Sequence, residues 1–162
     1  MANWKSIKRP KAREDAPCAE PEAPPPPPAS RLAAALLEGE RTGDKRLFYE
    51  TFLESKLLAP LRHEPPSSIN PRLADLNYLI RVCEGWPSLL GFSDLEALNE
   101  FFQGPRKVVY ATLAARDLCR IALGQEVDQL LINAAGPVGF SLSPLECQLL
   151  AEGVIPGDGL SR

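Results

Sequence analysis

The chain has 162 residues, of which 44% are hydrophobic, and this size suits one folded domain with an appendage. Its formal net charge of −3 argues against nucleic acid as the main partner, because phosphate binding requires clustered Lys and Arg residues. No stretch reaches the roughly 18 apolar residues of a membrane span, and no apolar segment follows the basic N-terminus as in a secretory signal. We therefore expect a cytoplasmic protein without a transmembrane segment.

The first 30 residues differ in composition from the rest of the chain. They contain 8 of the 17 prolines, including the run from Pro24 to Pro28, and very few large aliphatic residues. Such a segment cannot bury enough apolar surface to offset the entropy of ordering it, so we expect a disordered, proline-rich tail over residues 1–30. Its tip carries five Lys or Arg residues before the first acid, which leaves open a weak nucleic-acid-binding role for the tail.

Trp4 lies within this basic tip, in the stretch NWKSIKR. A large aromatic side chain is a typical interface anchor, so Trp4 is a candidate binding residue in a short docking peptide. The alternative is a solubilising tail that carries an incidental tryptophan. The proline run has two interpretations as well, as a ligand for an aromatic groove or as a plain spacer.

Two short helices are expected directly after the tail. The first covers residues 31–42, RLAAALLEGERT, where leucines recur at helical spacing. The second lies in DKRLFYETFLESK at residues 44–56, with Asp44 as its N-cap and Phe48 and Phe52 on one face. A short glycine-containing connection predicts that the two helices form a hairpin whose aromatic side chains enter the core.

Three short strands are expected in the middle of the chain. Residues 57–61 form an apolar run, which we interpret as an edge strand because it contains a proline. Alternation predicts a strand over residues 76–83, with Arg81 and Cys83 on the same face, although the stretch DLNYLIRVC could also form a helix. A further strand is expected over residues 88–92. A Gly-Trp-Pro break separates these two. Its Trp86 is either a packed side chain or an exposed binding anchor.

The next segment predicts two helices with a strand between them. Ser93 and Glu96 are expected to form a capping box at the start of the helix DLEALNEFF. A β-rich stretch, KVVYA, follows at residues 107–111. Thr112 is then expected to cap a helix over residues 113–124, which ends in glycine.

The segment VDQLLINAAGPVGFSLSPLECQLLA at residues 127–151 carries the strongest local signals. An apolar run up to Asn133 predicts a strand, and the AAGP sequence with Gly136 predicts a turn. Alternating residues then predict a second strand. Ser143, a following proline and Glu146 form the pattern of a capping box, so a helix should begin there.

The loop within this segment is the candidate ligand site. It runs from Asn133 to Gly139 and includes Gly136 and Pro137, and α/β domains often place ligands at strand ends. The structural alternative is that Asn133 hydrogen-bonds nearby backbone and fixes the turn. No phosphate-binding glycine motif, zinc-protease motif or nucleophile elbow is present in the sequence. The lone His63 follows no catalytic pattern and is interpreted as a surface residue.

The cysteines and the histidine argue against a metal centre. The four cysteines are far apart in sequence and form no Cys-x-x-Cys pair, and one histidine cannot complete a zinc site of the usual spacing. We therefore expect no metal and no cofactor. Free, buried cysteines in a reducing cytosol are the favoured interpretation, whereas two disulfides would require an exported protein.

Three segments occur in a recognisable order: FYETFLESKLLAPL, PSLLGFSDLEALNEF and VDQLLINAAGPVGFSLSPLECQLL. Together they resemble the N-terminal domain of the SseB family, a bacterial family named for enhanced serine sensitivity. The resemblance covers roughly residues 31–152. It implies a compact α/β domain, bacterial and usually cytoplasmic, with no assigned reaction. The chain departs from the family pattern where Ala134 follows Asn133, since the family usually has Asn-Pro there.

The sequence thus predicts one α/β (α+β) domain over residues 31–153, with tails at 1–30 and 154–162. We expect a mixed sheet of about five or six short strands and an N-terminal helical hairpin. The favoured function is a non-enzymatic interaction or regulatory module that binds a protein partner of unknown identity, with the tail as a docking arm. The alternative is a small-molecule-binding or enzymatic domain that uses the loop from Asn133 to Gly139. The sequence gives no oligomeric state.

Overall fold

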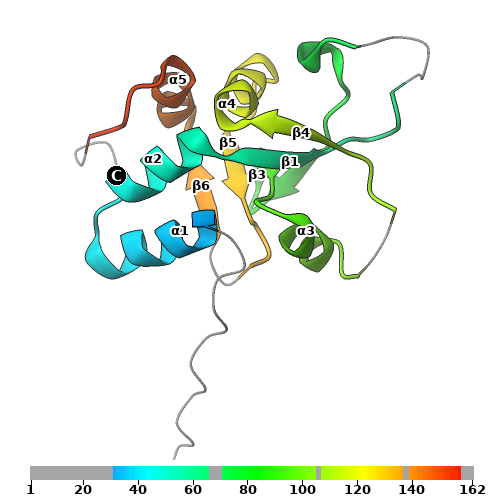
Figure 1. The fold of residues 1–162 in the computed structure, drawn as a ribbon. Coiled ribbons are helices and arrows are strands. Elements are labelled where there is room, and N and C mark those ends of the chain that lie inside the picture. The colour runs from blue at the N-terminus through cyan, green and yellow to red at the C-terminus, as the bar shows by residue number, and fades with distance from the viewer. Residues whose placement is uncertain (1–30, 66–70, 105–106, 137–138, 158–162) are drawn as a thin grey trace, which may run out of the picture.

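The computed structural model describes residues 31–65, 71–104, 107–136 and 139–157. The predictions for the tail at residues 1–30, including Trp4, and for Pro137 lie outside these ranges. The described residues form an α+β fold, as the sequence predicted (Figure 1). Its helices are α1 (Arg31–Thr42), α2 (Arg46–Glu54), the 3₁₀ helix η1 (Leu73–Asp75), α3 (Leu95–Phe101), α4 (Ala115–Gly124) and α5 (Pro144–Glu152). Its strands are β1 (Lys56–Pro60), β2 (Ile80–Cys83), β3 (Trp86–Gly91), β4 (Tyr110–Ala114), β5 (Gln129–Ile132) and β6 (Phe140–Leu142).

The strands form the mixed sheet that the sequence predicted. Four strands lie in the order β2-β3-β5-β6, and only the β3–β5 pair is parallel. Strands β1 and β4 form an antiparallel pair beside this sheet. Two backbone hydrogen bonds of 2.8 and 2.9 Å between Leu58 and Phe92 connect β1 to the end of β3. The prediction that this strand is an edge strand was therefore wrong, because β1 has a neighbour on each side at Leu58.

One face of the four-stranded sheet, the helical face, is buried in the main core. Successive strand residues point to opposite faces, and residues paired across strands point to the same face. The register therefore assigns to this face Ile80, Leu89, Leu130, Ile132, Phe140 and Leu142. These side chains belong to the same hydrophobic cluster as residues of α1, α2, α4 and α5.

The opposite face, the open face, is only partly covered by helix. The register assigns to it Arg81, Cys83, Trp86, Ser88, Leu90, Gln129, Leu131 and Ser141. Helix α3 covers one end of this side, where Leu90, Phe92 and Leu98 form a small second cluster of buried residues. Figure 1 shows α3 on the side of the strands opposite to α4 and α5. The domain therefore buries one sheet face under several helices, whereas the other face keeps Arg81, Trp86 and Ser141 exposed.

The helical hairpin forms as the sequence predicted. Helices α1 and α2 pack against each other, and Phe48, Tyr49 and Phe52 are all at most 3% exposed. The prediction that Asp44 is the N-cap of α2 was wrong, because Lys45 occupies that position. The carboxylate of Asp44 still accepts a hydrogen bond of 2.8 Å from the backbone N–H of Arg46, one of the free donors at the start of α2. The predicted aromatic stripe of α2 is thus part of the main core.

The last helix also begins where its capping signals placed it. The Ser143 side chain and the Glu146 side chain form the predicted capping box, and Pro144 occupies the first turn of α5. Gly153 ends the helix with a φ of 81°, a conformation that favours glycine. Beyond it, Ile155 packs against the main core.

Two other predicted helix starts were wrong. Thr112 lies within β4, opposite Leu58, and α4 begins only at Ala115 without a side-chain cap. A β-branched residue fits the interior of a strand well, which explains why β4 continues through Thr112 to Ala114. Helix α3 is capped by Asp94, whose carboxylate accepts a bond of 2.8 Å from the Ala97 N–H. Ser93 instead donates its hydroxyl to Asp94 at 2.7 Å.

The predicted Gly-Trp-Pro break was right for Gly85, which lies in the turn, and wrong for Trp86 and Pro87, which belong to β3. The turn consists of Glu84 and Gly85, with φ values of 53° and 88°. Positive φ at both central residues is the mark of a type I′ hairpin turn. Trp86 and Pro87 then pair with Cys83 and Val82 of β2. The strands β2 and β3 are consequently a tight hairpin with Trp86 next to its turn.

Candidate functional site

Asn133 lies at the end of β5 and is only 4% exposed. Its side-chain Oδ1 accepts a bond of 2.9 Å from the Ser93 N–H, and its Nδ2 donates to the Ser93 Oγ at 3.0 Å. Its backbone N–H donates to the Gly91 carbonyl at 2.9 Å. Asn133 therefore joins the end of β5 to the connection between β3 and α3.

These bonds continue into the N-terminal cap of α3. The Ser93 hydroxyl donates to Asp94, and Asp94 caps the helix. Asn133 thus positions α3 through Ser93, a partner 40 residues away. The expected bond to nearby backbone is made by its carbonyl, which accepts from the Gly136 N–H at 3.0 Å. A Cβ atom on Gly139 would lie 3.1 Å from the same carbonyl oxygen, so the loop packs closely at this point.

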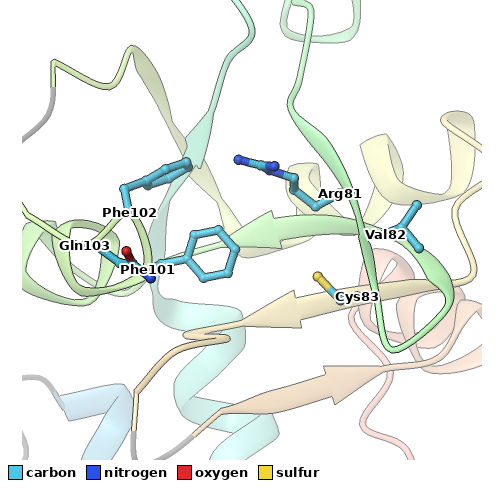
Figure 2. A pocket seen from close by; sticks show the side chains of 6 residues that line it. All are labelled: Arg81, Val82, Cys83, Phe101, Phe102 and Gln103. Atoms are coloured by element: carbon cyan, nitrogen blue, oxygen red, sulfur yellow. The ribbon is translucent and has the colours of Figure 1, made fainter.

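A groove lies at the other end of α3, on the open face. It has a volume of about 330 Å³ and is lined by Arg81, Val82, Cys83, Phe101, Phe102 and Gln103. Figure 2 shows the two phenylalanines reaching from α3 toward β2, and the Arg81 and Cys83 side chains facing them. The Val82 side chain points away from this space, so Val82 contributes its backbone to the groove.

A hydrogen-bonded row of polar side chains crosses the open face. Gln129 Nε2 donates to Ser88 Oγ at 2.9 Å, and Ser141 Oγ donates to Gln129 Oε1 at 2.8 Å. Ser88 in turn donates to the Trp86 carbonyl at 2.8 Å. The Trp86 side chain on this face is 58% exposed, whereas the 72% exposed Val82 at the sheet edge points to the opposite face, two positions from Ile80. The open face therefore combines satisfied polar groups with an exposed tryptophan.

The buried titratable groups of the domain have structural partners. Glu146 accepts bonds from the Tyr49 hydroxyl at 2.6 Å and from the Ser143 N–H and hydroxyl at 2.8 and 2.7 Å. Burial, followed by the bond to Glu146, raises the pKa of Tyr49. A hydrogen bond with Cys119 and burial raise the pKa of the Cys147 thiol, which disfavours the reactive thiolate.

The described residues show no further cluster of chemically reactive side chains. His63 is exposed, as the sequence predicted. Cys83, Cys119 and Cys147 carry no disulfide. Within the described ranges, no group of three or more His, Cys, Asp or Glu residues is arranged to hold a metal ion. None of the helices described there is both long enough and apolar enough to span a membrane.

Comparison with protein families decides the relationship that the sequence suggested. The family described as the SseB protein N-terminal domain matches residues 30–148. The chain belongs to the SseB family. Comparisons with curated proteins and with solved structures found no match. The matched region of this SseB domain runs from the start of α1 into α5, and it contains both the Asn133 loop and the groove.

The candidate residues of this SseB domain do not form one site. Trp86 begins β3, whereas Asn133 follows the end of β5, and these strands run parallel. The two residues therefore lie at opposite ends of the strand pair. Trp86 does not line the groove, but it lies beside it, because it pairs with the groove residue Cys83 on the same face. Pro137 and Trp4 lie outside the described residues.

Sequence reasoning missed the groove itself. The alternation over residues 76–83 placed Arg81 and Cys83 on one face of a strand, which is the face they occupy. The missing information was the position of Phe101 and Phe102, because no local pattern says which strand the end of a helix will approach. The signal present in the sequence was an aromatic pair at a helix end, followed by a glycine stop.

Proposed function

We propose that this SseB domain is a non-enzymatic interaction module that binds a protein partner through its open face. The observation that carries the proposal is the exposure of Trp86, at 58%, on the same face as the aromatic groove. Tryptophan and arginine are enriched among residues that dominate binding energy at protein interfaces, and the groove supplies Arg81.

The polar groups around the groove also favour binding over catalysis. Gln129 bonds both the buried Ser88 and the exposed Ser141, so Gln129 and Ser141 can present a fixed polar surface. The Asn133 amide is buried and bonded to Ser93, which favours its positioning role over contact with a substrate. These features support a preformed surface with few groups poised for proton transfer.

The N-terminal tail supplies a second, weaker contact in this proposal. It joins the domain at Arg31, and its basic tip carries Trp4. Two linked contacts bind more strongly than either alone, because the first raises the effective concentration of the second. Following the family resemblance, we place this activity in the bacterial cytoplasm.

The test is affinity capture from native cytosol with full-length protein, followed by mass spectrometry. Trp86→Ala should lose the specific partner, whereas Leu145→Ala, at a 50% exposed leucine of α5, should retain it. Deletion of residues 1–29 should weaken capture and leave the melting temperature nearly unchanged. Equal capture by wild type and Trp86→Ala would refute binding through the open face.

A further inference from the structure

The free edge of β2 presents backbone hydrogen-bonding groups at Val82. Val82 pairs with Pro87 of β3, and the Pro87 carbonyl accepts a bond of 2.9 Å from the Asp128 N–H. Pro87 therefore directs its backbone carbonyl away from β2, and as a proline it has no N–H to donate. In an antiparallel ladder, residues of such a non-bonded pair direct their own N–H and C=O outward. The Val82 N–H and C=O consequently point away from β3, out of the free edge of the sheet.

The hairpin turn gives the same register independently. A two-residue type I′ turn at Glu84 and Gly85 is closed by the hydrogen-bonded pair of Cys83 and Trp86. Bonded and non-bonded pairs alternate along the ladder, so Val82, one residue before Cys83, must belong to a non-bonded pair. Two separate observations thus agree on the direction of the Val82 backbone.

This edge lacks the usual protection against pairing. Strand β2 is the terminal strand of the four-stranded sheet. Natural edges are commonly blocked by Lys, Pro or a covering segment, whereas the central edge residue here is a valine that is 72% exposed. The described residues of the chain place no further strand against β2. The groove, moreover, lies directly beside this edge.

The groove also determines which side chains an added strand would need. Arg81 is exposed, and within the described part of the chain it forms no ion pair. Phe101, Phe102 and Cys83 supply an apolar wall. In an extended strand, side chains two positions apart point to the same face. An added strand could therefore place a carboxylate at Arg81 and an aromatic or large aliphatic group at the phenylalanines.

We propose that a partner protein adds a short extended segment to the free edge of β2 as a fifth strand. Its backbone pairs with Val82, and its groove-facing side chains are an acidic residue and an aromatic or large aliphatic residue two positions apart. This inference rests on the proposed function and names the partner chemistry for the same site. Strand addition of this kind takes affinity from main-chain bonds and specificity from alternate side chains.

Two other occupants fit the edge less well. The basic tip of the tail, from Lys5 to Arg13, would bring like charge to Arg81, and the acidic part of the tail is interrupted by prolines that cannot complete a ladder. A second copy would pair through an edge of four residues, which spans only about 13 Å. A stable dimer usually buries about 1,200–2,000 Å². The edge alone is too short for that area.

The first test selects binders to the full-length protein from a phage-displayed library of random linear peptides. Enriched peptides should share an acidic residue two positions from an aromatic or large aliphatic residue. Arg81→Glu should lower their affinity about tenfold or more, since a charge-assisted contact becomes repulsive. Arg72→Glu, at an exposed arginine next to η1, should leave the affinity unchanged. Absence of this pattern, or equal binding by Arg81→Glu, would overturn the proposal.

The second test examines the backbone pairing with the enriched peptides. Methylation of one peptide nitrogen should abolish binding when that nitrogen faces the Val82 carbonyl, and methylation of its neighbours should not. Nuclear magnetic resonance should show the Val82 amide shifted and protected from exchange in the complex. A peptide that tolerates methylation at every position would refute strand addition.

The two proposals can fail separately. If Trp86→Ala loses the native partner while no peptide recognises β2, the open face stands as an interface and strand addition is wrong. If sedimentation shows a dimer of the wild type that Val82→Lys dissociates, the edge pairs with a second copy and the proposed partner segment is wrong. If peptides bind β2 while Trp86→Ala retains the partner, strand addition stands and the wider open-face interface falls.

Discussion

At the residue scale, Asn133 connects the sheet to α3 through backbone and side chain together. Its φ of 53° lies in the left-handed region, which asparagine tolerates better than most residues with a side chain. Its side-chain amide bonds the backbone N–H and the hydroxyl of Ser93 in a site where water has little access. Asparagine therefore serves this position in two ways: it tolerates the positive φ, and its side-chain amide bonds Ser93.

Replacing Asn133 separates these two contributions. We expect Asn133→Ala to lower the free energy of unfolding by about 2–4 kcal/mol, because the Ser93 N–H loses its acceptor and alanine is strained at positive φ. Asn133→Gly should lower the free energy of unfolding by about 1 kcal/mol less than the alanine variant does. Glycine also lacks the amide, but it adopts positive φ without strain. Urea unfolding measures both changes, with the exposed Asn77→Ala as control. Equal losses of stability in the alanine and glycine variants would contradict the claim that strain at positive φ contributes.

Two buried tyrosines make the stability depend on alkaline pH. Burial, followed by the charge of Asp117, raises the pKa of Tyr78 from its ordinary 10 to about 12, and the pKa of Tyr49 is raised as well. Above pH 10 the unfolded chain loses these protons while the folded chain keeps them. The stabilisation that the raised pKa values provide is therefore fully present below pH 10, and it is lost as the pH rises above that value.

We expect the free energy of unfolding to fall between pH 10 and 12, by up to about 1.4 kcal/mol per pH unit for each tyrosine. Tyr78→Phe should reduce this slope, and the double change with Tyr49→Phe should reduce it further. The exposed Tyr110→Phe should not alter it. Urea titrations at a series of pH values provide the measurement. An unchanged slope in the double variant would show that other groups cause the alkaline loss.

At the element scale, Gly91 allows α4 to approach β3 closely. A Cβ atom there would lie 2.8 Å from Leu118 Cδ2 and 2.9 Å from Ile132 Cδ1. Leu118 and Ile132 are fully buried, so neither can move freely. We expect Gly91→Ala to destabilise the fold by about 1–3 kcal/mol through overpacking. Thermal and urea unfolding should show Gly124→Ala, where no atom is near, as neutral or slightly stabilising.

The success of the sequence predictions at this scale depends on whether the signals were local. The Ser143 capping box and the aromatic stripe of α2 require only neighbours in sequence, and both were predicted. Thr112 was misassigned because its β-structure depends on pairing with Leu58. Trp86 and Pro87 were assigned to a break because only the hairpin with β2 makes them part of a strand.

The candidate site was harder to predict for the same reason. Asn133 was singled out, but its partner Ser93 lies 40 residues away and no spacing rule connects them. The groove requires β2 and the end of α3 to meet, which is decided by packing on the sheet. The sequence therefore indicated single polar and aromatic residues but could not group them.

At the scale of the whole molecule, the sheet has one face buried by helices and one that is only partly covered. A face that carries exposed Trp86, a partly apolar groove and an unpaired strand edge is typical of an interaction surface. The main core, by contrast, lies on the helical face, where residues of α1, α2, α4 and α5 pack. A partner bound to the open face would therefore leave the main core unchanged.

Hydrogen exchange of the protein, alone and with its captured partner, tests this account most directly. We predict that partner binding slows exchange in residues 80–91 and 101–103, and leaves α4 and α5 as they are in the free protein. Those two helices serve as an internal control, because they cover the other face of the sheet. Slower exchange confined to α4 and α5, with no change in β2 or at the end of α3, would contradict the assignment of the open face as the binding surface.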